Sequence, residues 1–157
     1  MTAMAELLGV LVLLGNGLTA GVLFAVALSV VPAMAAMPAA RYVYVHQLLG
    51  RNWDPTMPVI VLASALADLA LAMGSDIWSR TALFGTAALL LLAVSVVSHF
   101  RNVPINRRVK ALDPQRLPPD WGDPRPEWRR WHLTRTVLAV TALALNALAL
   151  TVVPAGA

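Results

Sequence analysis

The sequence predicts an all-α integral membrane protein, a bundle of four transmembrane helices formed as one domain by residues 1–157. Its composition is far more apolar than that of a soluble domain, with 59% hydrophobic residues and a mean hydropathy of +0.70. Four apolar runs approach the length that crosses a bilayer: residues 7–31, 59–73, 81–97 and 137–153. None has the charged outer face that a helix in a soluble bundle needs, which argues against a soluble bundle.

The first predicted helix covers residues 5–31, and Pro32 is expected to end or kink it. It carries Gly17 and Gly21, a spacing of small residues that lets helix backbones approach closely in lipid. The pair serves either packing within the chain or contact between two copies, so a homo-oligomer is one expectation. Asn16 should face the bundle interior, because a polar group at membrane depth is costly beside lipid.

A short amphipathic helix, residues 39–49, is predicted between the first and second transmembrane helices. Tyr42 and His46 lie four residues apart and share one face of it. The next segment, GRNWDP at residues 50–55, has the glycine, asparagine and proline typical of a turn. We therefore expect a turn there, before the second transmembrane helix begins.

The second transmembrane helix should start at residue 55 or 58 and end at residue 74, with Asp68 inside it. A carboxylate within the membrane is costly and indicates function, unless it is hydrated near the helix end, and both interpretations stay open. The short link at residues 75–80 makes the third helix, residues 81–100, an antiparallel neighbour of the second.

A long polar loop is predicted between the third and fourth helices. Residues 101–136 hold nine of the twelve Lys and Arg residues and three of the five Trp residues. The fourth helix should begin near Pro126, inside this polar segment, and end near Val153.

Eleven of the twelve cations flank the two loops on one side of the bundle, and only Arg80 lies on the other. The positive-inside rule then predicts that the loops between helices 1 and 2 and between helices 3 and 4 are cytoplasmic and both termini outside. Because the charge adjoins apolar spans, its expected partner is the lipid bilayer and not a nucleic acid.

Asn102 and Asn106 flank Pro104 in the segment N-V-P-I-N, at the predicted end of the third helix. Pro104 removes a backbone donor and disfavours a helix at the preceding residue. The two amides either cap the helix end or orient a ligand, since each offers a donor and an acceptor.

Trp128, Trp131, His132 and Arg135 project from one broad face of the fourth helix. Arg135 is the last cation before the apolar run. It either extends to the lipid headgroups or points inward, where it would stabilise an anion with help from the indole N–H groups.

All three histidines, His46, His99 and His132, fall on the same predicted membrane side. A single histidine acting as a general base is the favoured interpretation, because imidazole titrates near neutral pH. A metal ion held by all three is the weaker alternative, since no two have a local ligand spacing. The chain has no cysteine, which excludes a thiolate site, and we predict no cofactor.

Three motifs resemble the anthrone oxygenase-like family of small four-helix membrane proteins. They are V-V-P-A-M-A-A-M-P at 30–38, R-N-V-P-I-N at 101–106 and W-R-R-W-H-L-T-R-T at 128–136. In the third motif, Trp128, His132 and Arg135 match a family pattern of Trp, His four residues on, and Arg three beyond; Trp131 is an additional indole.

The resemblance implies oxygen insertion into a small, hydrophobic, activated aromatic substrate of the anthrone or phenol type, without flavin or haem. The implied base is His132 or His46. Groups that hold the oxygen anion would be Arg135, Asn102 and Asn106. The residues expected to contact the substrate are Trp128, Trp131, Tyr42 and Gln47.

Two other functions fit the same sequence. One is a non-catalytic membrane scaffold whose basic loop binds lipid or a partner. The other is a small transporter or metal-binding protein that uses Asp68, Asn16 and Asn146. Burial separates them, because an enzyme needs a pocket lined by an indole, Arg135 and an asparagine amide, whereas a scaffold leaves these groups facing headgroups.

Overall fold

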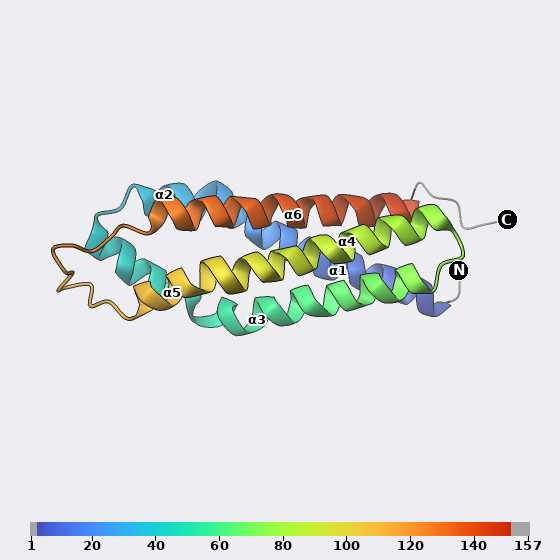
Figure 1. Cartoon of the computed structure of the whole chain (residues 1–157), viewed down its shortest axis with the longest axis horizontal. Helices are drawn as coiled ribbons and strands as arrows, with labels where there is room; N and C mark the ends of the chain where they lie inside the picture. Colours follow the sequence, from blue (N-terminus) through green and yellow to red (C-terminus); the bar gives the residue numbers. More distant parts are fainter. Residues whose placement is uncertain (1–2, 152–157) are drawn as a thin grey trace.

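The computed structural model describes residues 3–151, and in this range the chain is helical, with short links at 36–38 and 74–77, a longer loop at 111–124 and no strand (Figure 1). Its helices, including two five-residue π-helical turns labelled η, are α1 (Ala3–Ala25), η1 (Val26–Val30), α2 (Val31–Ala35), α3 (Ala39–Met73), α4 (Trp78–Val97), η2 (Ser98–Asn102), α5 (Val103–Lys110) and α6 (Arg125–Thr151).

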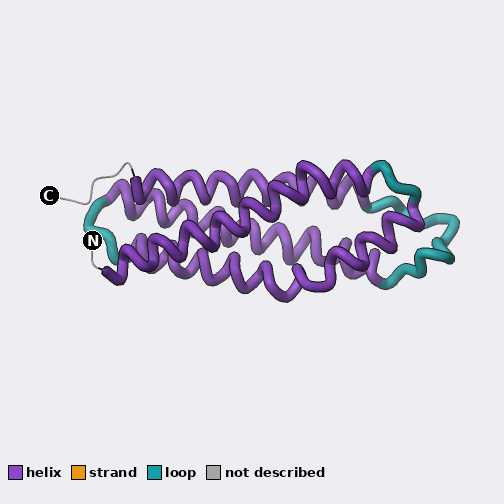
Figure 2. Tube along the Cα trace, turned by 180° about the vertical axis from the view of Figure 1, so that it is seen from behind, coloured by secondary structure: helices purple, strands orange, loops and turns teal. Residues whose placement is uncertain are grey.

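Within the described residues, four segments are long and apolar enough to cross a membrane: Ala3–Ala35, Thr56–Met73, Trp78–Lys110 and Arg125–Thr151. They form a bundle in which α1 packs on α3, α3 on α4, α4 on α6 and α6 on α1. The links that follow α2 and α5 lie together at one end, and the short link before α4 lies at the other (Figures 1 and 2). The predicted all-α fold with four helices long and apolar enough to cross a membrane is confirmed, while the side of the membrane that each end faces stays a prediction.

The predicted turn at residues 50–55 is wrong, because α3 runs without interruption from Ala39 to Met73 and includes the predicted amphipathic helix. The helix bends along its length, as expected of one that contains Pro55 and Pro58 (Figure 1). A helix that ended in a turn at Gly50 would favour a left-handed backbone there, yet no described residue has a positive φ. Packing of the flanking segments thus overrides the local turn signal.

The prolines at 32 and 104 do not end their helices either. Each follows a π-helical turn, in which the backbone N–H of Val31 bonds Val26 O and that of Val103 bonds Ser98 O, five residues back. The wider turn adjusts the hydrogen-bond ladder next to a residue that cannot donate. As a result, the segment N-V-P-I-N is not a helix terminator, and the third span continues into α5.

The fourth helix begins as predicted, with Pro126 in its first turn. Its described part ends at Thr151, so the predicted end near Val153 lies outside the described residues.

The loop end of the bundle is closed by a buried apolar cluster beneath α5 and the α5–α6 loop. The Gln47 amide nitrogen donates to the carbonyls of Val109 and Leu112 at 3.3 and 2.8 Å, which fixes the end of α5. The cluster consists of Val31, Met34, Tyr42, Val43, Ile105, Val109 and Trp128.

Arg125 fastens the other side of this loop. Its Nη1 donates to Met37 O at 2.6 Å and to Met34 O at 3.3 Å, and its guanidinium lies 5.3 Å from the centre of the Tyr42 ring. A hydrogen bond from Arg125 lowers the pKa of Asp123. Burial, with a smaller contribution from Asp123, raises the pKa of Tyr42 to about 12, so its ring stays neutral.

Gly15 is the glycine that sets the distance between α1 and α3. A Cβ placed there would lie 2.1 Å from Ser64 Oγ, whereas one at Gly17 or Gly21 would meet nothing within 4 Å. Packing within the chain therefore does not account for the Gly17 and Gly21 pair.

We expect Gly15→Leu to lower the thermal stability of the purified protein, by about 1–3 kcal/mol, because the larger side chain forces α1 and α3 apart. Gly17→Leu is the matched control on the same helix, and it should leave the melting temperature nearly unchanged because that position is open. Equal losses for the two variants would contradict the close approach at Gly15.

A buried polar cluster lies toward the end of the bundle where α3 and α6 finish. Asn16, Asp68 and Asn146 have no exposed surface, and Asn16 Nδ2 donates to Asp68 Oδ2 at 3.4 Å. The Asn146 side chain approaches the same carboxyl group. The prediction that Asn16 faces the interior is thus confirmed, and the three polar groups of the helices interact with one another.

Candidate active site

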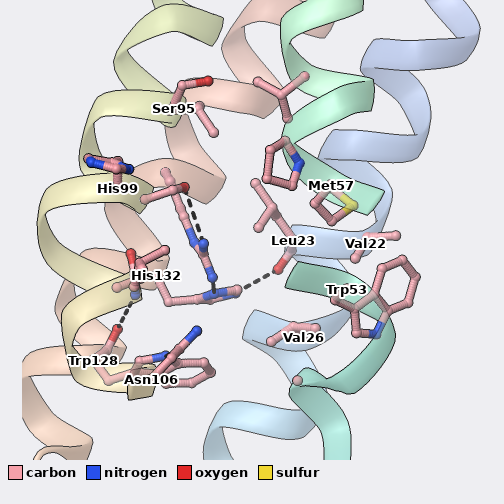
Figure 3. Close-up of a pocket in the computed structure, with 18 of the residues that line it drawn as sticks. Val22, Leu23, Val26, Trp53, Met57, Ser95, His99, Asn106, Trp128 and His132 are labelled. Carbon is pink, nitrogen blue, oxygen red and sulfur yellow. Dashed lines mark hydrogen bonds between the residues drawn. The ribbon is translucent and has the colours of Figure 1, made fainter. Parts of the chain in front are cut away.

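One cavity of about 710 Å³ lies at the loop half of the bundle, and all four spans line it. Most of its wall is aliphatic, and a polar region is confined to one part (Figure 3). The residues of that polar region include His46, Ser98, Asn102, Asn106, Trp128, His132 and Arg135.

Arg135 points inward and not to the lipid headgroups. Its Nη2 donates to His132 Nδ1 at 3.0 Å, and its Nη1 donates to Ser98 Oγ at 3.3 Å. The π-helical turn η2 carries Ser98, so the guanidinium lies between α6 and the end of α4. Of the two predicted orientations of Arg135, the structure has the inward one.

His132 is almost fully buried and is held from both ring nitrogens. Nε2 lies 3.0 Å from the carbonyl oxygen of Leu23, and Nδ1 accepts from Arg135. A carbonyl only accepts and a guanidinium only donates, so the ring is neutral with its proton on Nε2. Neither nitrogen has a lone pair available for a substrate proton.

Asn106 has a fixed amide orientation. Its Oδ1 accepts from the indole Nε1 of Trp128 at 3.0 Å and lies 3.1 Å from His46 Nε2. Because the amide oxygen only accepts, His46 Nε2 must carry a proton, and the lone pair of the neutral ring is on Nδ1. The NH₂ group of Asn106 remains the donor that it can offer to a ligand in the cavity.

Trp128 lies between the two histidines. Its ring is stacked on that of His132, with centroids 5.2 Å apart, and meets the His46 ring edge-on at 5.6 Å. Asn102, which is 1% exposed, donates from Nδ2 to the backbone carbonyl of Trp128 at 3.5 Å. The segments α3, η2, α5 and α6 thus hold one connected set of rings and amides against the cavity.

Three predicted substrate contacts lie outside the cavity lining. Trp131 packs between two guanidinium groups, with Arg101 and Arg130 at 4.8 and 4.9 Å from its ring centre. Tyr42 is fully buried under the α5–α6 loop, and Gln47 holds the end of α5. These three residues stabilise the closed end of the bundle and do not contact the space that a substrate would fill.

No group of three or more His, Cys, Asp or Glu residues in the part of the chain that is described is arranged to hold a metal ion. His99 lines the cavity but is exposed, and its ring packs on Phe100 at 4.9 Å. His132 already uses both ring nitrogens. The weaker prediction of a site built from His46, His99 and His132 therefore gains no support from the geometry.

Sequence reasoning missed the carbonyl of Leu23 and the hydroxyl of Ser98 as members of the site. Both lie beside a π-helical turn: Leu23 three residues before η1, and Ser98 at the first position of η2. The shared pattern of a proline two residues after the turn, Pro32 and Pro104, was a usable signal, because distorted turns are frequent at functional sites.

The family model described as Anthrone oxygenase matches residues 46–145. No curated protein and no solved structure matches the chain. The matched region begins at His46 and contains every residue of the polar part of the cavity, and it covers more than half of the sequence. The chain therefore belongs to the anthrone oxygenase family.

Proposed function

We propose that the protein is a membrane-embedded oxygenase that uses O₂ to oxidise an activated aromatic substrate of the anthrone or phenol type. The observation that carries this proposal is the apolar cavity with a histidine, an amide and a guanidinium gathered on one part of its wall. Such a wall can deprotonate an acidic carbon and stabilise the oxygen anion that results.

His46 is the proposed general base. Its bond to Asn106 Oδ1 sets the tautomer and leaves the basic lone pair on Nδ1, a buried atom that a rotation of the ring would bring to a substrate in the cavity. His132, the other base suggested by the sequence, accepts from Arg135 and donates to Leu23, so it would have to give up a hydrogen bond before taking a proton. Its proposed role is to position Arg135.

Arg135 and the NH₂ group of Asn106 are the proposed donors to the oxygen anion of the deprotonated substrate. Both side chains are held before any ligand arrives, Arg135 by His132 and Ser98, and Asn106 by Trp128 and His46. Donors fixed in advance stabilise developing charge without the cost of reorienting, and the effect is larger where water is excluded.

The proposed reaction balances with O₂ as the single oxidant. The base removes a proton from the methylene carbon, and the carbanion passes one electron to O₂. The carbon radical and superoxide then combine to form a C–O bond, and the peroxide loses water to leave a carbonyl. One oxygen atom stays in the product, the other leaves in water, and the four electrons taken up by O₂ come from that carbon.

The burial pattern supports an enzyme over the alternatives drawn from the sequence. Trp128, Arg135 and the two asparagines line a cavity, where a lipid-binding scaffold would expose them to headgroups. The Asp68 cluster that a transporter would use is fully buried and is not part of the cavity lining.

The test is oxygen uptake by purified protein in lipid discs with an anthrone, under ¹⁸O₂, together with metal analysis of the same preparation. We expect uptake above the spontaneous rate and one labelled oxygen atom in the quinone product. Asn106→Ala should lower this rate. Uptake that is equal with and without protein, or unchanged in both Asn106→Ala and Arg135→Ala, would rule out the proposed site.

A further inference from the structure

We propose that the cavity exchanges its ligand with the bilayer, through a lateral opening between α3 and the α4–η2 segment. The ligand class that follows is a membrane-dissolved aromatic amphiphile, which enters from the lipid with its polar group leading. That the ligand is a substrate rests on the proposed function, whereas the route depends on the shape of the molecule alone.

Cavity-lining residues that also reach the outer surface mark this opening. Leu62 on α3 is 45% exposed, and Val96 and Phe100 on the facing segment are 55% and 66% exposed, yet all three line the cavity. They belong to segments that are apolar and long enough to cross a membrane. His99 on one side and Met57 on the other border the same space (Figure 3).

Leu49 and Trp53, on α3 nearer the loop end, also line the cavity and are 44% and 46% exposed, so the exposed rim extends along α3 toward that end. The tip of the loop end is different. There the cavity is covered by the buried cluster that contains Tyr42, Val43 and Ile105. Gln47 ties this cover to α5, and Arg125 ties it to the carbonyls before α3. Entry from water would require this packed cover to unfold locally, whereas entry from lipid crosses a rim of apolar side chains.

The distribution of polarity in the cavity fits such a ligand. Most of its hydrogen-bonding groups come from η2, α5 and α6, with His46 added from α3, and aliphatic side chains of α1 and α3 form much of the remaining wall. An aromatic body would stay against the aliphatic wall while a hydroxyl or carbonyl reaches the donors. A strongly charged ligand would have no favourable path across the rim, because moving a charge through hydrocarbon is costly.

The absence of native cysteine makes the route directly measurable. Ser95 lines the cavity from α4 and is not one of the proposed site groups, so Ser95→Cys places a nearly isosteric thiol inside. Leu92→Cys, one turn earlier and 45% exposed, is a matched thiol that faces lipid outside the cavity. Each is treated in lipid discs with N-ethylmaleimide or with a sulfonated maleimide, and labelling rates are measured by mass spectrometry.

We expect N-ethylmaleimide to label position 95 faster than position 92, because a thiol that faces hydrocarbon ionises poorly and the thiolate is the nucleophile, and the sulfonated reagent to label neither. Adding Leu62→Trp should slow labelling at position 95 by about tenfold or more, a barrier increase of about 1.4 kcal/mol. Leu66→Trp, on the same helix and outside the cavity lining, should leave this rate unchanged, and neither tryptophan should affect position 92.

Three results would overturn the lateral opening: labelling at position 95 by the sulfonated reagent, failure of both reagents there, or no effect of Leu62→Trp. None of these measurements requires turnover. If the labelling pattern holds and oxygen uptake fails, the opening stands and the proposed function falls. If oxygen uptake is observed and the labelling pattern fails, the proposed function stands and the opening falls.

Discussion

His46→Ala is expected to lower kcat for oxygen uptake by about 10²–10⁴-fold, the range that a positioned general base contributes. The alanine variant keeps the cavity and the Arg135 group but has no acceptor for the substrate proton. Wild-type activity should fall on the acidic side of its pH profile, because a protonated imidazole cannot accept a proton. This acidic limb should be missing in the variant, and added imidazole should restore part of the rate.

The matched control for His46 is His99→Ala. His99 lines the same cavity, but its ring packs on Phe100 and has no part in the hydrogen bonds around Asn106. Its replacement should change kcat only slightly. If His46→Ala keeps both the rate and the acidic limb, the assignment of His46 as the base is wrong. If His99→Ala loses both, His99 is the base instead.

The four spans were predictable because hydropathy alone fixes them: a lipid-facing helix needs an apolar surface whatever its neighbours are. The prediction failed where local and tertiary preferences compete. Gly50, Pro55 and Pro104 are turn or helix-breaking residues by local rules, yet the chain stays helical at all three positions. Packing of α3 and α5 at the loop end, including the bonds from Gln47, supplies a stabilisation that a single sequence does not reveal.

The site was predictable to the extent that its residues share one helix. Trp128, His132 and Arg135 lie on one face because of helical periodicity, and all three line the cavity. The pairing of His46 with Asn106 joins residues sixty positions apart, and only the packing of α3 on α5 creates it. Helical periodicity also placed Trp131 on this face and so predicted a substrate contact. In the structure its ring packs on Arg101 and Arg130 and does not line the cavity.

Arg135→Ala is expected to lower kcat/KM by about 10²–10³-fold, the loss that follows removal of one preorganised donor to a developing anion. Arg135→Lys keeps the charge but has no planar fork that reaches His132 and Ser98 at once, so it should recover only part of the activity. Arg129→Ala is the matched control, because Arg129 is exposed on the same helix and outside the cavity lining. Oxygen uptake measured over a range of substrate concentrations separates kcat from KM for each variant.

The same measurements distinguish a positioning role of His132 from an independent one. If His132 acts by holding the guanidinium, His132→Leu should reduce kcat/KM in the wild-type background and have little further effect in Arg135→Ala, since residues that act as a unit are not additive. Additive losses would mean that His132 contributes through another contact, with the hydrogen bond to Leu23 as the remaining candidate. A thermal melt of each variant is the required control, because His132 is buried and also joins α6 to α1. A fall in kcat/KM that simply follows the loss of folded protein would contradict the positioning role.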